Sequence, residues 1–227
     1  MNYAIIQCRL NSYRLPGKAM LDICGKPVLE HVINRVSIAK NLDNNIIVVT
    51  GINPYNQPIV SLCEKKMIDC FTGDNDNVLK RVYDWMLYAD IKDEDNIVRI
   101  TADCPLIDGK IIDTMLDIIG DNPYVGNQNN MIDGFDIEII KAKCLKEAYN
   151  KYREDEHLTL KWKTDNQDLL KYYYYDNTDR SKLHLSLDTL SDYVNISIIF
   201  EEVMMLKNYN FNYEDVLNYL EVIRNAK

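Results

Sequence analysis

A short stretch near the N-terminus concentrates side chains that can bind an anion. In residues 7–18, QCRLNSYRLPGK, these are Arg9, Ser12, Arg14 and Lys18. Guanidinium groups bind phosphate oxygens in pairs and an ammonium adds a compact charge, so this set can hold a polyphosphate. The Pro16-Gly17 step favours a tight turn that keeps the loop in one shape. The alternative is a solvated loop with unrelated cations.

Several other kinds of site have no support in the sequence. The spacings GxxxxGK[ST] and GxGxxG are absent, so the loop is neither a Walker P-loop nor a dinucleotide-binding fingerprint. The histidines His31, His157 and His184 show no metal-ligand spacing, and we assign His31 to the surface of its helix. Because no Ser-His-Asp arrangement or nucleophile elbow is visible, covalent catalysis is not indicated.

Two aspartates follow predicted strands. Asp103 stands in RITADCPL, just past a strand, where its carboxylate could coordinate Mg²⁺; the alternative is a turn-forming residue. Asp188 follows LHLSL, residues 183–187, immediately before a helix, and the pattern favours a role as helix cap. Paired with Asp103, it becomes a candidate second metal ligand. The separation of 85 residues leaves that pairing to the fold.

The elements that must position these residues alternate β-branched runs with amphipathic helices. The predicted strands are Tyr3–Gln7, Asn45–Thr50, Met67–Phe71 and Asn96–Ile100, and the predicted helices are Val28–Ala39, Tyr55–Lys66, Asn77–Ala89 and Lys110–Ile119. This alternation is typical of βαβ units around a parallel sheet. Ligands of open α/β sheets bind outside the carboxyl ends of the strands, so the basic loop after the first strand is where an anion would be held.

The second half changes pattern. Residues 134–140, GFDIEII, alternate as an antiparallel or edge strand does, with Phe135, Ile137 and Ile139 on one face and Asp136 and Glu138 on the other. A helix over 141–152 and further strands over 169–175 and 183–187 follow. In the last strand the leucines face the core, opposite His184, Ser186 and Asp188. Helices from Thr189 to about Leu206 and from about Tyr213 to Arg224 close the chain, and we expect a single domain over residues 1–227.

Composition sets further limits. The 227 residues carry 26 Lys plus Arg against 35 Asp plus Glu, a formal charge of −9, which argues against a nucleic acid or an anionic membrane as partner. With 47% hydrophobic residues the chain can bury a sizeable core. No apolar run approaches the roughly 18 residues of a membrane span. We therefore expect a folded, cytoplasmic protein.

Several segments form an ordered series of motifs. They are IIQCRLNSYRLPGKAMLDICGKPVLEHVI from residue 5, FTGDNDNVLKR from 71, RITADCPL from 99, GFDIE from 134, EHLT from 156 and LSLDT from 185. In this order they resemble the cytidylyltransferase family that includes spore-coat polysaccharide biosynthesis enzymes, CMP-KDO synthetases and acylneuraminate cytidylyltransferases. The resemblance implies an α/β, Rossmann-related (GT-A-like) nucleotidyltransferase fold: a central, mixed but mostly parallel sheet flanked by helices, with a small antiparallel extension.

The resemblance also implies an activity and roles for residues. The enzyme would couple CTP to an acidic sugar or sugar phosphate, with Mg²⁺ and release of pyrophosphate, for surface-glycan or polysaccharide biosynthesis, and would form a homodimer through residues 134–175. Arg9, Ser12, Arg14 and Lys18 would bind the triphosphate; Gln7, Asp76, Arg81 and Thr101 the nucleoside; Asp103 and Asp188 the Mg²⁺; and Asp136, Glu138 and His157 the sugar. The catalytic group would be Arg9, Lys18, Asp103 and Asp188.

The chain departs from the family pattern at three positions. Cys8 replaces an alanine, Ala102 a glycine and Leu190 a proline; none of these changes removes a charged group. Two alternative functions keep the same fold: a sugar-1-phosphate nucleotidylyltransferase that uses another nucleoside triphosphate, and a catalytically silent nucleotide-binding scaffold. The metal-type carboxylates argue against the scaffold. The sequence leaves the acceptor sugar and the base selectivity open.

Overall fold

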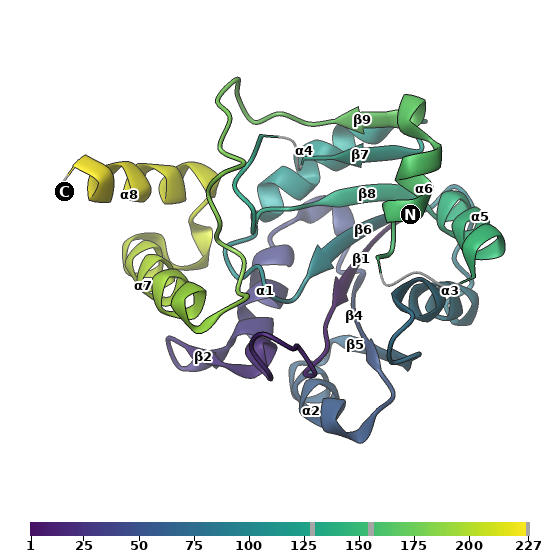
Figure 1. Cartoon of the computed structure of the whole chain (residues 1–227), viewed down its shortest axis with the longest axis horizontal. Coiled ribbons are helices and arrows are strands. Elements are labelled where there is room, and N and C mark those ends of the chain that lie inside the picture. The colour runs from purple at the N-terminus through teal and green to yellow at the C-terminus, as the bar shows by residue number, and fades with distance from the viewer. Residues whose placement is uncertain (128–129, 154–156, 226–227) are drawn as a thin grey trace.

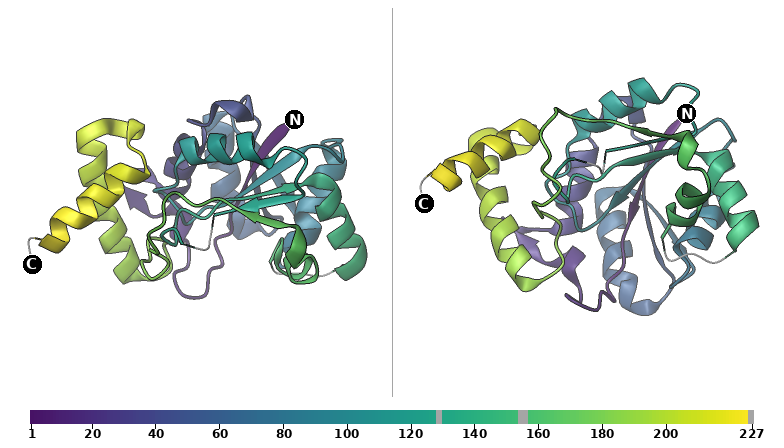
Figure 2. Two further views of the ribbon diagram at one scale, coloured as in Figure 1. Left: turned by 90° about the horizontal axis from the view of Figure 1, so that it is seen from above. Right: turned by 45° about the horizontal axis from the view of Figure 1, so that its top comes forward.

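A central sheet with helices on both faces organises the molecule (Figures 1 and 2). The computed structural model describes residues 1–127, 130–153 and 157–225. The strands are β1 (Asn2–Gln7), β4 (Ile46–Gly51), β5 (Asp69–Gly73), β6 (Asn96–Thr101), β7 (Tyr124–Gly126), β8 (Glu138–Lys141) and β9 (Leu170–Tyr172), in the sheet order β5-β4-β1-β6-β8-β7-β9. Only β8 among them pairs antiparallel with its neighbours. The mixed, mostly parallel sheet is therefore confirmed.

The sheet reverses its direction of growth at β1. From β1 the chain adds β4 and then β5 on one side, and it returns to place β6 on the other side of β1. The loops that follow β1 and β6 thus leave the sheet side by side, and the crevice between such loops is where open α/β sheets bind ligands. This arrangement brings the basic loop next to the segment that carries Asp103.

Helices cover the two faces with different core clusters. The helices are α1 (Val28–Val36), α2 (Gln57–Lys66), α3 (Val78–Tyr88), α4 (Gly109–Ile119), α5 (Ala142–Tyr152), α6 (Leu160–Asp165), α7 (Leu190–Lys207) and α8 (Tyr213–Asn225). Helices α1, α2, α4 and α7 pack with Ile6, Val48 and Val98 in one cluster, whereas α3, α5 and α6 pack with Ile5 and Ile47 in the other. Adjacent strand residues point to opposite faces of the sheet, and helices bury both faces.

The antiparallel extension is shorter than the alternation predicted. Phe135, Ile137 and Ile139 are fully buried as expected, but the strand begins only at Glu138. The strand predicted over 169–175 is limited to β9, and the one predicted over 183–187 is wrong, since that segment makes a single bridge between Asp133 and His184. The alternation identified Leu185 and Leu187 as buried correctly but was wrong for Leu183, which is exposed. A strand also needs a continuous partner for its backbone.

Gly134 explains why the two segments lie so close. Its φ is +107°, and a Cβ at this position would lie 2.5 Å from the carbonyl carbon and oxygen of Leu185. Only a residue without a side chain permits that approach. The backbone of Leu185 in turn donates to the carbonyl of Asp133 at 2.7 Å, which fixes the segment leading to Asp188.

His31 does not lie on a surface, contrary to the sequence interpretation. Its side chain is 1% exposed; Nε2 lies 2.6 Å from the carbonyl of Ile23 and Nδ1 lies 2.8 Å from the hydroxyl of Tyr209. Phe200 of α7 packs against the ring. The C-terminal segments thus cover a helix face that looked solvent-exposed from its own sequence.

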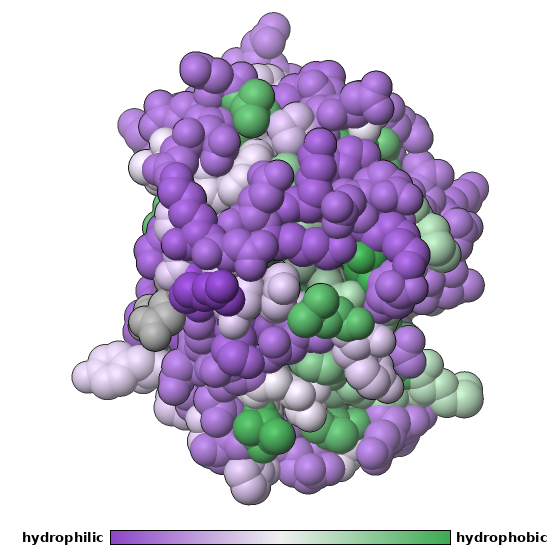
Figure 3. Space-filling view, turned by 90° about the vertical axis from the view of Figure 1, so that its right-hand side faces the viewer, coloured by the Kyte–Doolittle hydropathy of each residue, from purple (hydrophilic) through white to green (hydrophobic). Residues whose placement is uncertain are grey.

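The face shown in Figure 3 is mostly hydrophilic, with apolar residues gathered in its lower half. None of the helices in the described ranges has both the length and the apolar character that crossing a bilayer requires.

Candidate active site

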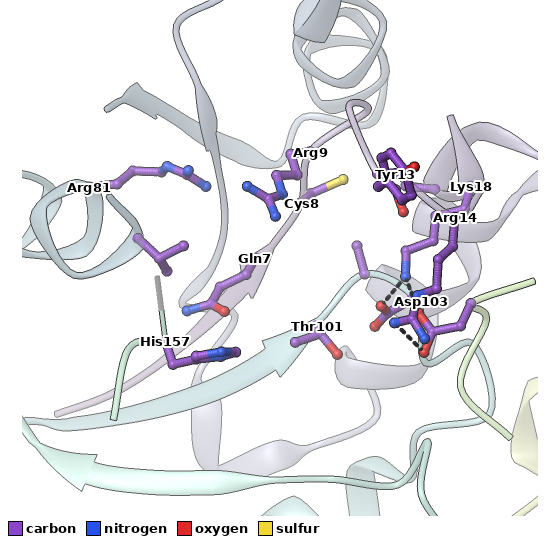
Figure 4. Close-up of a pocket in the computed structure, with 15 residues that line it drawn as sticks. Gln7, Cys8, Arg9, Tyr13, Arg14, Lys18, Arg81, Thr101, Asp103 and His157 are labelled. Atoms are coloured by element: carbon purple, nitrogen blue, oxygen red, sulfur yellow. Dashed lines mark hydrogen bonds and ion pairs between the residues drawn. The ribbon is translucent and has the colours of Figure 1, made fainter. Parts of the chain in front are cut away.

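A pocket of about 410 Å³ opens at the crevice beside β1 and β6. Ten of the residues singled out from the sequence line it: Gln7, Arg9, Ser12, Arg14, Lys18, Arg81, Thr101, Asp103, His157 and Asp188. Figure 4 shows Arg14, Lys18 and Asp103 converging at one end, with Gln7, Arg81 and His157 toward the other. Segments that are far apart in the sequence therefore form one cavity.

Two carboxylates share one ammonium group at the first end. Lys18 Nζ donates to Asp103 Oδ2 at 2.6 Å and to Asp188 Oδ1 at 3.0 Å, and Arg14 Nη2 lies 2.8 Å from Asp188 Oδ2. Burial opposes ionisation of Asp103, but Lys18 holds the pKa of its carboxyl below the ordinary value. Conversely, burial favours the neutral amine at Lys18, but the two carboxylates raise its pKa. The pKa shifts of Asp103 and Lys18 thus both favour the charged forms of this pair.

Local backbone contacts bring the two aspartates together. The amide of Leu187 donates to the carbonyl of Asp103 at 2.9 Å, so the residue before Asp188 is bonded directly to the loop after β6. Helix α7 is capped by Thr189, whose side chain and the carboxylate of Asp192 form a capping box. Asp188 is therefore not the helix cap that the sequence pattern favoured, and its carboxylate is directed to Lys18 instead.

The loop carrying Lys18 is held by its own turn. Gly17 adopts φ +73° at the start of the 3₁₀ turn Lys18–Met20, and its amide donates to the carbonyl of Leu10 at 2.9 Å. The amide of Leu10 donates to Asn56 Oδ1 at 3.0 Å, which ties the loop to the segment after β4. The turn predicted at Pro16-Gly17 thus sets the position of the ammonium.

The other end of the pocket carries Arg9 and Arg81. Arg81 is 1% exposed, and its guanidinium donates to the backbone carbonyls of Asp74 and Asn75, at 2.8 and 2.9 Å. Burial, together with repulsion from Arg9, lowers the pKa of Arg81. Within the described part of the chain, no carboxylate lies within ion-pair distance of Arg9. Among the described residues this end therefore carries arginines that form no ion pair, while Asp74 and Asp76 act on Arg81 at longer range.

Glu138 lies in a second, smaller pocket of about 180 Å³, which shares His157 with the first. The carboxylate is 1% exposed and accepts from Arg99 at 2.7 Å, Lys163 at 2.6 Å and Tyr124 at 2.8 Å. Burial would raise the pKa of Glu138, but the two cations lower it to about 2. Protein donors thus occupy both oxygens of this carboxylate.

Two of the residues singled out from the sequence lie outside both pockets. Asp76 is exposed, in the turn before α3. Asp136 is half-buried next to Asp133, and burial together with that neighbouring carboxylate raises its pKa. Asp133 Oδ2 lies 2.5 Å from His184 Nδ1, and His184 Nε2 lies 3.9 Å from Asp188 Oδ2. Asp136 is therefore linked to Asp188 of the larger pocket through Asp133 and His184.

Several residues of the site were missed from the sequence. Tyr13, Ala19 and Val78 also line the larger pocket, as do Cys8 and Ala102, which the sequence marked only as departures from the family pattern. Arg99 bridges the two pockets, since its Nε donates to Gln7 Oε1 at 3.3 Å while its Nη1 donates to Glu138. A charged residue inside the apolar strand NIVRIT was the available signal for Arg99.

The comparisons with known proteins agree with this geometry. A model of the family described as cytidylyltransferase matches residues 3–217. The chain belongs to the cytidylyltransferase family. As a cytidylyltransferase it is a nucleotidyltransferase enzyme, and the fold class and the family resemblance inferred from the motifs are confirmed.

Relatives in sequence cover most of the cytidylyltransferase. An uncharacterised protein of Methanocaldococcus jannaschii is 32% identical over 197 residues, 83% of this chain and 79% of its own. An 8-amino-3,8-dideoxy-manno-octulosonate cytidylyltransferase of Shewanella baltica is 28% identical and covers 82% and 67%. The spore coat polysaccharide biosynthesis protein SpsF of Bacillus subtilis is 24% identical and covers 87% and 85%.

Solved structures show the same fold. A cytidylyltransferase from Leptospira borgpetersenii superposes with a TM-score of 0.85 at 27% identity, covering 99% of this chain and 95% of that one. A CMP:2-keto-3-deoxy-manno-octonic acid synthetase complexed with CTP gives 0.67 at 16% identity, covering 88% and 98%. A Mycobacterium tuberculosis protein described as a complex with manganese gives 0.62 at 13% identity, covering 87% and 97%.

The donor set at the first end fits a hard divalent cation. Asp103 and Asp188 offer oxygen ligands, and both already lie around one cation, the ammonium of Lys18. No group of three or more His, Cys, Asp and Glu side chains that could hold a metal exists among the described residues. Mg²⁺ is commonly held in this way, by one or two carboxylates with its remaining ligands from water and substrate phosphate.

Proposed function

We propose that the chain, acting as one nucleotidyltransferase domain, couples CTP to a sugar with release of pyrophosphate in a Mg²⁺-dependent reaction. The observation that carries the proposal is the convergence of Lys18, Asp103 and Asp188 at one end of a pocket whose other end holds Arg9 and Arg81. Carboxylates for a metal beside cations for phosphate suit nucleotidyl transfer. A protein that only bound a nucleotide would not need the carboxylates.

The residues of the basic loop act on the triphosphate. Arg9, Arg14 and Lys18 bind its oxygens, with Ser12 as a further donor, and they stabilise the negative charge that develops on the α-phosphate and the leaving pyrophosphate. Such transfer is largely positioning and electrostatic stabilisation, and the sugar oxygen attacks the α-phosphate in line. Asp103 and Asp188 hold Mg²⁺, which when bound neutralises phosphate charge and orients the reacting groups.

The nucleoside lies toward the other end of the pocket in this proposal. Gln7 and Thr101 stand at the ends of β1 and β6, and Arg81 contributes its guanidinium from α3. Asp76 contributes to the ribose or base from the neighbouring turn. Arg99 keeps the Gln7 carboxamide oriented, because a guanidinium only donates and therefore faces the carboxamide oxygen.

The sugar binds beside the smaller pocket and the Asp136 segment. His157 reaches the larger pocket, where the acceptor must meet the α-phosphate. Because protein donors occupy the Glu138 carboxylate, it acts on the sugar through the cations it positions, Arg99 and Lys163. Two relatives named for an octulosonate and for spore-coat polysaccharide support an acidic sugar or sugar phosphate and a role in surface-glycan biosynthesis. We also propose a cytoplasmic homodimer formed through residues 134–175.

Pyrophosphate release tests the proposal directly. Purified protein with Mg²⁺ receives CTP, UTP, GTP or ATP in turn, each against a panel of acidic sugars and sugar phosphates. CTP-selective release with one acceptor is the expected result. Release with another triphosphate and a sugar 1-phosphate would favour the alternative nucleotidylyltransferase, whereas CTP binding without release from any pair would favour the scaffold.

A further inference from the structure

We infer that Lys18 is the resident cation of the Asp103–Asp188 pair and exchanges with the divalent metal, so that metal loading frees the lysine for the triphosphate. The inference rests on the assignment of Asp103 and Asp188 as metal ligands in the proposed function. It adds an order of events that this assignment does not contain: the lysine and the metal compete for one position before they cooperate on the nucleotide.

Lys18 is held between the two carboxylates. Its ammonium lies 2.6 Å from Asp103 Oδ2 and 3.0 Å from Asp188 Oδ1, and the three side chains are 13%, 23% and 16% exposed. In so enclosed a site each carboxylate needs a cation, because an unpaired buried charge is costly. A metal ligated by both carboxylates would supply that cation, and Lys18 would no longer be required between them.

The charges at the Lys18 end of the pocket balance one another before a metal binds. Lys18 and Arg14 are both paired with carboxylates, so the four charges at this end cancel. Arg9 and Arg81, which form no ion pair with a carboxylate of the described residues, lie elsewhere in the pocket. A divalent cation on the two carboxylates adds two positive charges and releases the two paired side chains. The end that is neutral without metal then becomes the strongest anion site of the pocket.

Metal binding without nucleotide tests this exchange, because it requires no turnover. Mn²⁺ is titrated into wild type and Lys18→Met, and free Mn²⁺ is followed by electron paramagnetic resonance. Lys18→Met should bind Mn²⁺ roughly 10- to 100-fold more tightly, since the metal no longer displaces a charge-assisted hydrogen-bond donor. Equal or weaker binding by the variant overturns the inference.

Matched variants separate exchange from a general loss of positive charge. Arg9→Met removes a cation from the same pocket that has no carboxylate partner, so its Mn²⁺ affinity should stay within about threefold of wild type. Lys18→Arg keeps a cation near the carboxylates and should also stay near wild type. The double variant Lys18→Met/Asp103→Asn should lose the gain; if it keeps the gain, Mn²⁺ binds elsewhere and the inference fails.

Thermal unfolding covers the case in which Lys18→Met folds poorly without metal. Its Tm should then rise with Mn²⁺ more than the Tm of wild type, because the metal supplies the missing cation. The absence of such a rise overturns the inference. The proposed function is tested separately. If Lys18→Met binds Mn²⁺ more tightly but wild type releases no pyrophosphate from any substrate pair, the proposed reaction is rejected while the exchange of Lys18 with the metal is supported.

Discussion

Lys18 Nζ lies 2.6 Å from Asp103 Oδ2, although 85 residues separate the two in the sequence. The contact joins the loop after β1 to the segment after β6, the two neighbouring strands between which the order of the sheet reverses. The larger pocket of this cytidylyltransferase is therefore lined by an ion pair at the switch point of its sheet.

Replacing Asp103 tests the proposed metal-binding end of the pocket. Asp103→Asn keeps the shape of the side chain but removes the charge that faces Lys18, so kcat should fall by roughly 10²- to 10³-fold, as for other lost preorganised electrostatic groups. Pyrophosphate release at saturating CTP measures the effect. The exposed Asp121→Asn serves as the matched control. A wild-type kcat in Asp103→Asn would remove this carboxylate from the mechanism.

Arg99 should matter for stability. In Arg99→Met the buried carboxylate of Glu138 keeps Lys163 but loses one of its two cations, so the free energy of unfolding should fall by about 3 kcal/mol. Urea unfolding measures the change. Lys161→Met, a lysine of the same helix as Lys163 that lies outside the smaller pocket, is the comparison and should change stability far less. Equal effects of the two variants would contradict the role of the ion pair.

The same carboxylate predicts a pH dependence. The pKa of Glu138 is lowered from 4.5 to about 2 in the folded protein. Because the folded pKa lies below the unfolded one, the contribution to stability is complete above about pH 4.5 and disappears as the pH falls toward 2; it is on the order of 3 kcal/mol. Urea midpoints measured between pH 6 and 2.5 should show this decline, with a shallower slope in Glu138→Gln. Parallel slopes would show that Glu138 does not titrate in this way.

Gly134 provides a test of the backbone approach. In Gly134→Ala the new Cβ would lie 2.5 Å from the carbonyl of Leu185 at a φ of +107°, so both a clash and backbone strain arise. We expect a loss of roughly 3 kcal/mol or more in unfolding free energy. Gly17→Ala, in the left-handed conformation (φ +73°, ψ +10°) and with no atom within 4 Å of the new Cβ, should lose only about 1 kcal/mol. Similar losses at the two glycines would argue against the close approach.

The sequence by itself determined the helices, strands and turns that depend on residues close together in the chain. The predicted strand Asn96–Ile100 is observed as Asn96–Thr101, and the predicted helix Asn77–Ala89 as Val78–Tyr88. Periodicity of apolar residues is a property of neighbouring residues, so it is visible without a fold. The turn at Gly17, which sets the position of Lys18, was visible for the same reason.

Only the tertiary structure decided which polar side chains meet. The position of Asp188 depends on a backbone bond from Leu187 to the loop after β6 and on a cap supplied by Thr189. The burial of His31 depends on segments more than 160 residues away. In both cases the environment of a charged or polar group is created by distant chain segments. Sequence spacing records the order of residues along the chain, whereas ion pairs and burial depend on distances in space.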